Sequence, residues 1–278
     1  MMFLFRLCSR LPLWLLHLLG GWLGWLSFLA SPSYRRRLLA HARMADASPL
    51  GAVAQAGRML AEIPWLWLRP ATTTLPLHWD GAEKVEAALA GRQGLLLLTP
   101  HMGCFEAAAQ ALAERFGATQ PITVLYRPAR KPYLRELVAA GREREHLRAA
   151  PAQLSGVRQM LRALRGGEMV GLLPDQVPPE GQGVWAPFFG QPAYTMTLAA
   201  RLVQQTGCAV LTLWCERLPL GQGFVVHVRD FPPLAPEATA EQAATAINQA
   251  MERLILERPA QYLWGYNRYK APRAADGG

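Results

Sequence analysis

A long uncharged apolar run near the N-terminus constrains this chain more than any other feature. Residues 11–30 contain no Asp, Glu, Lys or Arg, and arginines stand on both sides of the run. About twenty apolar residues match the ~30 Å hydrocarbon core of a bilayer. We therefore expect residues 1–33 to form a membrane-anchoring helix and residues 34–278 to form a separate globular domain.

Three interpretations of this run compete. A cleaved signal peptide is disfavoured, because the apolar stretch is long and leads directly into Arg35-Arg36-Arg37. A membrane-spanning helix and a helix that lies in the membrane interface both remain open. The arginines are slightly more numerous after the run than before it, which favours a cytoplasmic position for the domain that follows.

The charge of the chain narrows the class of partner. The net charge is +9, and only three of the 29 basic residues are lysines. Such a surface suits nucleic acid, anionic lipid or an acidic carrier protein. No zinc finger, aromatic RNA-binding motif or basic helix-turn-helix is present in the sequence, so the apolar run favours lipid phosphate and we predict no nucleic-acid partner. The four cysteines and six histidines show no metal-ligand spacing, so we predict no metal.

From residue 75 onward, strand-like and helix-like segments alternate. This alternation predicts an α/β fold, with a mostly parallel central sheet flanked by helices. Helices are expected near 132–146 and 193–206, and a Gly/Pro-rich loop from 174 to 192. Two capping boxes are predicted, Asp80 with Glu83 and Thr239 with Gln242. The expected strands cover residues 75–79, 94–99, 122–126, 168–174, 208–216 and 223–229.

The motif TPHMGCFE, residues 99–106, directly follows the most hydrophobic of these strands. Ligands of open α/β sheets bind beyond the carboxyl ends of strands, so His101 stands where chemistry is expected. If His101 lies in a loop and Glu106 in the first helical turn, with Gly103 allowing the bend, the two side chains can converge. A carboxylate beside an imidazole supports general-base attack by an alcohol.

Other interpretations of this motif remain open. His101 could merely close a strand-to-loop junction while Glu106 complements a helix dipole. Cys104 is the rival nucleophile, because a helix N-terminus stabilises a thiolate. A cysteine in such a place is more often packed as a small hydrophobic residue, and we favour that interpretation.

Further motifs follow the first one in order. They are YRP at 126–128, LPDQ at 173–176, GVWAPFFGQPA at 183–193 and Thr206-Gly207, with an aromatic and basic ending at 262–270. Together with the N-terminal apolar run, this order resembles the late acyltransferases of lipid A assembly, the lauroyl and myristoyl transferases of the lysophospholipid acyltransferase superfamily. The family has Asn-Trp before the motif acid, whereas this chain has Cys104-Phe105.

The resemblance implies an O-acyltransferase whose domain covers residues 34–278. It would transfer a fatty acyl chain from acyl carrier protein or coenzyme A, as co-substrate, to a hydroxyl of a lipid A precursor at the bacterial inner membrane. No cofactor is implied beyond that thioester. The resemblance makes His101 and Glu106 the catalytic dyad. It also implies four substrate contacts: Arg127, Asp175, Gln176 and Gly190.

Two alternatives stay open beside this hypothesis. One is an acyltransferase with the same dyad that acts on a glycerophospholipid or an ornithine lipid. The other is a membrane lipid-binding protein whose dyad is inactive. The presence of His101, Glu106, Arg127 and Asp175 together argues against the second alternative.

Overall fold

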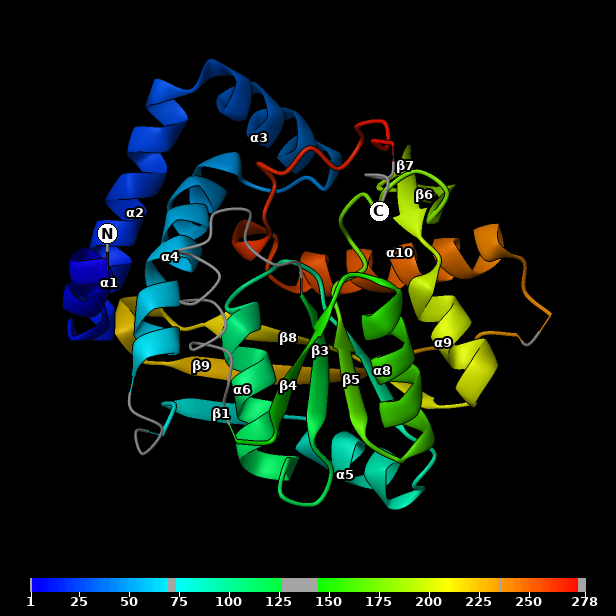
Figure 1. The fold of residues 1–278 in the computed structure, drawn as a ribbon. Coiled ribbons are helices and arrows are strands. Elements are labelled where there is room, and N and C mark those ends of the chain that lie inside the picture. The colour runs from blue at the N-terminus through cyan, green and yellow to red at the C-terminus, as the bar shows by residue number, and fades with distance from the viewer. Residues whose placement is uncertain (1, 70–73, 127–144, 236, 275–278) are drawn as a thin grey trace.

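The computed structural model describes residues 2–69, 74–126, 145–235 and 237–274 (Figure 1). Arg127, predicted to contact substrate, lies outside the described residues, as does nearly all of the helix expected near 132–146.

The centre of the molecule is a seven-stranded sheet. Neighbouring strands are parallel except for one antiparallel pair, β8 with β9. The predicted α/β fold with a mostly parallel sheet is therefore confirmed. The strands lie in the order β1 (Leu77–Asp80), β9 (Phe224–Asp230), β8 (Ala209–Arg217), β2 (Leu95–Leu98), β5 (Met169–Leu172), β3 (Ile122–Tyr126) and β4 (Leu147–Pro151).

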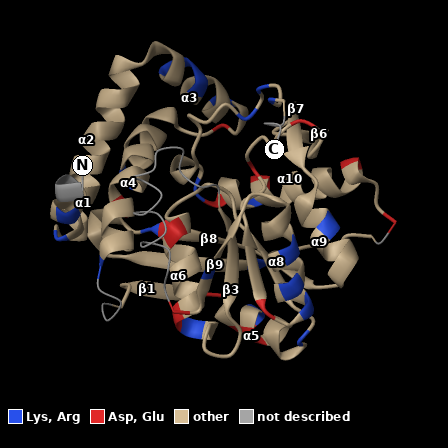
Figure 2. Cartoon of the chain, in the orientation of Figure 1, with Lys and Arg blue, Asp and Glu red and all other residues tan. Residues whose placement is uncertain are grey.

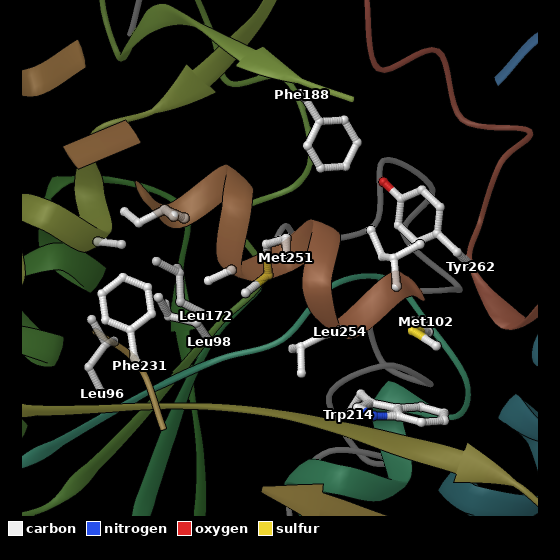
Figure 3. Packing of buried hydrophobic residues seen from close by; sticks show 14 of the residues in the cluster. Leu96, Leu98, Met102, Leu172, Phe188, Trp214, Phe231, Met251, Leu254 and Tyr262 are labelled. Atoms are coloured by element: carbon white, nitrogen blue, oxygen red, sulfur yellow. The ribbon is translucent and has the colours of Figure 1, made fainter. Parts of the chain in front are cut away.

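Helices cover both faces of this sheet, so the residues of β2 and β5 are buried on both sides. Leu95 and Leu97 of β2 join a core with α5 (Ala82–Ala90) and α6 (Phe105–Phe116). Leu96 and Leu98 point to the opposite face (Figure 3). That second core is closed by α8 (Leu154–Arg165), α9 (Leu198–Thr206) and α10 (Ala240–Glu257).

Four N-terminal helices pack beside this sandwich (Figure 1). Among the described residues, α2 alone is long and apolar enough to cross a membrane. It does not stand apart from the rest of the molecule, because it packs along α4. The four helices are α1 (Met2–Ser9), α2 (Leu13–Ala30), α3 (Pro32–Met44) and α4 (Pro49–Leu68).

A β-hairpin replaces part of the predicted loop and the start of a predicted helix. Strands β6 (Gly183–Phe188) and β7 (Gln191–Met196) pair antiparallel, and α9 begins only at Leu198. The Gly and Pro residues that suggested a loop are accommodated in a two-stranded sheet outside the main one, where no second neighbour needs their hydrogen bonds. Strand β4 was also not anticipated.

One predicted helix cap is confirmed and one is wrong. Thr239 and Gln242 form the reciprocal capping box of α10. Asp80 instead ends β1, and its carboxylate accepts hydrogen bonds from His227 and Arg229. Gly81, with a φ of 93°, is the N-cap of α5 in its place. The Asp80 carboxylate therefore binds distant charged side chains and does not cap the helix.

Candidate active site

His101 lies in the short loop between β2 and α6, at the carboxyl end of the central strand. Glu106 is the second residue of α6 and lies in its first turn. Gly103, between them, has a φ of 57°, in the left-handed region that favours glycine. The predicted bend of the motif is therefore confirmed.

The backbone of this loop is hydrogen-bonded to the segment that follows α10. The carbonyl oxygen of His101 accepts a hydrogen bond from the Leu263 amide at 3.1 Å. The Gly103 amide donates to the carbonyl of Gln261 at 3.0 Å. Since both contacts are made by main-chain atoms, they fix where the His101 side chain starts.

Strand β8 holds the loop from another side. The Cys104 amide donates to the carbonyl of Cys215 at 2.8 Å, and Arg217 Nη2 donates to the carbonyl of Gly103 at 2.9 Å. A Cβ at Gly103 would overlap the carbonyl oxygen of Cys215. Glycine is therefore required here for its conformation and for the close approach of β8.

The imidazole of His101 is held by a carboxylate from a distant part of the chain. Nδ1 lies 2.7 Å from Asp175 Oδ1, and the His101 amide donates to Asp175 Oδ2 at 2.9 Å. Asp175 follows β5, the parallel neighbour of β2, so both residues emerge at the same edge of the sheet. One carboxylate thus fixes both the backbone and the ring of His101.

Asp175 is suited to remain ionised in this position. Its side chain is 2% exposed, and burial by itself raises the pKa of a carboxyl. The charge of His101, the two hydrogen bonds from His101 and the charge of Arg268 outweigh burial, so the pKa of Asp175 lies below its ordinary value. A buried anion at Nδ1 stabilises an imidazolium and keeps the proton of the neutral ring on Nδ1.

The other nitrogen of the ring is free to react. Within the described part of the chain, His101 Nε2 makes no hydrogen bond, and the side chain is 18% exposed. The ring of Phe105 packs edge-on against the imidazole, with centroids 5.1 Å apart. A neutral ring with a proton on Nδ1 leaves Nε2 as the basic atom of a partly exposed side chain.

Glu106 lies close to this loop but has a different described partner. Its Oε2 accepts a hydrogen bond from Trp67 Nε1 at 3.2 Å, at the end of α4. Within the described residues, the carboxylate hydrogen-bonded to the imidazole belongs to Asp175 and not to Glu106. The sequence pattern indicated Glu106 as the partner of the imidazole, whereas the fold brings Asp175 to Nδ1.

The other predicted substrate contacts are placed as follows. Gln176 is half-buried, beside Asp175. Gly190 is exposed in the turn between β6 and β7 and has a φ of 72°, which is reason enough for a glycine there. Tyr126 ends β3 at the same edge of the sheet as Asp175, and Arg127 follows it outside the described residues. None of these positions has a described hydrogen bond to the His101 side chain.

Comparison with known proteins decides the class of enzyme. The model of the bacterial lipid A biosynthesis acyltransferase family matches residues 50–271. The chain belongs to this family. It is therefore an acyltransferase of lipid A biosynthesis, and the resemblance of its motifs is confirmed.

Curated relatives agree with this assignment. The acyltransferase is 28% identical over 217 residues to a lipid A biosynthesis lauroyltransferase of Escherichia coli (strain K12), which covers 77% of this chain and 68% of that protein. It is 26% identical over 219 residues to a lipid A biosynthesis palmitoleoyltransferase of the same organism, with 77% and 68% covered. A lipid A biosynthesis acyltransferase of Haemophilus influenzae is 26% identical over 184 residues, with 66% and 56% covered.

The environment of Cys104 bears on the rival chemistry in this acyltransferase. Cys104 is the N-cap of α6 but is only 3% exposed. Burial, the charge of Glu62 and the neighbouring Cys215 raise the pKa of its thiol well above the ordinary value. A thiol that resists ionisation is a poor nucleophile, so the geometry favours His101 as the reactive group.

A buried ionic cluster behind the loop was not foreseen from the sequence. Arg217 Nε and Nη2 donate to the two carboxylate oxygens of Glu62, and Nη1 donates to Gln55 Oε1 at 2.9 Å. His17 Nε2 lies 2.7 Å from Glu62 Oε1. A lone glutamate in an apolar helical stretch was the available signal, since a buried charge needs a partner.

Proposed function

We propose that this acyltransferase moves a fatty acyl chain from an acyl thioester, on acyl carrier protein or coenzyme A, to a hydroxyl of a lipid A precursor. His101 is the general base of this reaction. The observation that carries the proposal is the pair of hydrogen bonds from His101 to the buried Asp175 carboxylate, which leaves Nε2 as the basic atom of a side chain that is 18% exposed.

The proposed reaction needs no covalent enzyme intermediate. Nε2 takes the proton of the acceptor hydroxyl while its oxygen attacks the thioester carbonyl carbon. The carbon–sulfur bond breaks, and the imidazolium returns the proton to the leaving thiolate. The products are an ester and a thiol, so atoms and charge balance. Asp175 stabilises the imidazolium between the two proton transfers.

Glu106 stays in the proposal as the second catalytic residue of the motif. Its position in the first turn of α6, one residue beyond the Phe105 ring that packs on His101, supports a role near the reacting hydroxyl. Asp175 supplies the orientation of the ring, so we assign it to positioning instead of to substrate contact. Arg127, Gln176 and Gly190 remain proposed contacts for the substrate.

Attachment to the inner membrane, with the catalytic domain on the cytoplasmic side, completes the proposal. Lipid A precursors are amphiphiles, and the apolar α2 supports a position at the lipid surface. The proposal keeps residues 1–33 as the membrane-anchoring segment and residues 34–278 as the acyltransferase domain, with α2 of the first packed along α4 of the second.

The experiment that tests the proposed function compares lipid A from a deletion strain carrying no plasmid, the wild-type gene or a His101→Ala gene. We expect mass spectrometry to show one acyl chain missing without the gene and restored by the wild type alone. An unchanged lipid A profile with altered glycerophospholipids or ornithine lipids would move the proposal to those acceptors. Purified enzyme, given the same acyl chain on carrier protein or on coenzyme A, identifies the donor.

A further inference from the structure

Helix α2 has two different faces. One face carries seven large hydrophobic side chains that are exposed in the part of the chain that the structure describes. Among them, Trp22 is 70% exposed, Leu26 is 63% exposed and Leu29 is 65% exposed. The helix has no charged residue, as its uniform colour in Figure 2 shows. A contiguous apolar face of this kind is costly to leave in water.

The opposite face is in close contact with α4. A Cβ added to Gly57 would overlap the carbonyl oxygen of Gly20, and a Cβ added to Gly24 would overlap that of Val53. Glycines at these positions let the two helix backbones touch, as small residues do wherever helices pack closely. The closest approach lies on the turn of α2 from Gly20 to Gly24.

A buried polar contact also joins the two helices. His17, which is 4% exposed, reaches Glu62 of α4, and Arg58 Nε donates to the carbonyl of His17 at 3.2 Å. Glu62 is at the same time paired with Arg217 of the central sheet. Moving α2 into a bilayer on its own would leave His17 in hydrocarbon and remove a partner of a fully buried carboxylate.

Both ends of α2 are held by the same globular body. At its N-terminal end, α1 packs against α4. At its C-terminal end, α3 begins immediately after the Ser31 cap and packs on the core through Leu38. His41 of α3 lies within hydrogen-bond distance, 3.0 Å, of the carbonyl of Trp264 near the C-terminus. A helix whose two ends are fixed to one body can have them on opposite sides of a membrane only if that body enters the bilayer with it.

The charges around α2 indicate what covers its exposed face. The first 45 residues hold six arginines and no Asp or Glu, so they contribute +6 of the net charge of +9. Arg6, Arg10 and Arg36 are exposed. Two copies of this region brought face to face would repel each other, whereas an anionic lipid surface attracts both the arginines and the apolar face.

From these observations we infer that α2 lies in one leaflet of an anionic bilayer and does not span it. Its exposed face enters the acyl region, its glycine face stays on α4, and the arginines at both ends meet lipid phosphates on the same side. At 18 residues the helix is about 27 Å long, close to the ~30 Å hydrocarbon core, so the contacts at its two ends, and not its length, decide against a spanning position. This inference rests on the membrane attachment in the proposed function and adds how α2 is placed in the membrane. It does not depend on which acyl transfer the enzyme performs.

Thiol labelling at the two ends of α2 tests this placement directly. In a Cys8→Ser background, Arg10→Cys and Ser33→Cys each place a single thiol at an exposed position, while Cys104, Cys208 and Cys215 stay buried. A membrane-impermeant maleimide is applied to intact spheroplasts, to inverted inner-membrane vesicles and to detergent-solubilised membranes. The detergent sample shows that each thiol can react.

We expect both thiols to be labelled in the same preparation and neither in the other. Labelling of one thiol in spheroplasts and the other in inverted vesicles would establish a spanning helix and overturn the inference. Protection of both thiols in both preparations would overturn it as well, because the ends would then lie inside the bilayer. None of these results depends on acyl transfer, so a failure here is distinguishable from a failure of the proposed function.

A matched pair of substitutions tests the apolar face. Leu26→Asp changes a leucine of α2 that is 63% exposed, and Leu154→Asp changes one of α8 that is 66% exposed. Binding of the purified variants to vesicles of phosphatidylethanolamine and phosphatidylglycerol is measured by co-sedimentation. We expect Leu26→Asp to bind about tenfold more weakly or worse, and Leu154→Asp to bind as the wild type. Equal binding by both variants would show that lipid does not cover this face.

Discussion

At the scale of single residues, the Asp175 carboxylate that is hydrogen-bonded to His101 Nδ1 determines how His101 acts as a base. We expect Asp175→Asn to lower kcat by about 10²–10⁴ and to leave KM nearly unchanged, because an amide neither stabilises an imidazolium nor selects the reactive tautomer. Steady-state kinetics of the purified variant, with Glu106→Gln in parallel, measure the effect. A raised KM with an unchanged kcat would instead make Asp175 the substrate contact that the family motifs imply.

The bend at Gly103 gives a second expectation at this scale. Gly103→Ala should reduce acyl transfer severely, because the added Cβ would overlap the Cys215 carbonyl and displace the loop of His101. Gly207→Ala is the matched control, since Gly207 has a similar φ of 66° but nothing within 4 Å of an added Cβ. Activity per folded protein is compared for the two variants. Equal losses would mean that backbone strain alone matters and that loop displacement does not.

At the scale of elements, α4 is joined to the central sheet by the Glu62–Arg217 pair. Burial raises the pKa of Glu62, but the charge and hydrogen bonds of Arg217 and His17 outweigh burial, so the pKa lies below its ordinary value. A depressed folded-state pKa means that this stabilisation is fully present above about pH 4.5 and is lost as the pH falls through the folded value. Acid should therefore weaken the attachment of α4.

Glu62→Gln tests this element-scale expectation. Because it leaves Arg217 buried without its anion, it should lower the free energy of unfolding by about 3–5 kcal/mol at neutral pH. It should also flatten the acid side of the stability profile, measured by chemical denaturation at several pH values. Asp80→Asn removes an exposed ionic partner and should cost less than about 1 kcal/mol. A profile for Glu62→Gln that parallels the wild type would contradict this account.

Local patterns in the sequence predicted the elements better than the contacts between them. The strand before His101, the bend at Gly103 and the cap at Thr239 depend on neighbouring residues, and all three are confirmed. The bond between His101 and Asp175 joins residues 74 positions apart. Parallel strands predict that such residues share an edge, but not which acid reaches the imidazole. The β6–β7 hairpin was missed because its Gly and Pro residues read locally as a loop.

At the scale of the whole molecule, α2 is part of the fold as well as a membrane attachment. Deleting residues 1–30 would expose the face of α4 that carries Val53 and Gly57 and would remove His17 from Glu62. We expect the truncated chain to lose stability and to fail equally on bilayer and detergent-dispersed substrate. Circular dichroism and activity in both presentations measure this. A stable truncated enzyme that is defective only on bilayer substrate would show that residues 1–30 act as an anchor independent of the fold.

The rate of acyl transfer by purified His101→Ala tests the central claim most directly. The variant keeps the loop backbone contacts but removes the proposed base, so we predict single-turnover transfer about 10²–10⁴ slower than in the wild type, with folding and membrane attachment unchanged. Cys104→Ala, measured beside it, should remain active because the buried thiol does not ionise readily. A His101→Ala enzyme within a few-fold of wild type, or a Cys104→Ala enzyme without activity, would contradict the account.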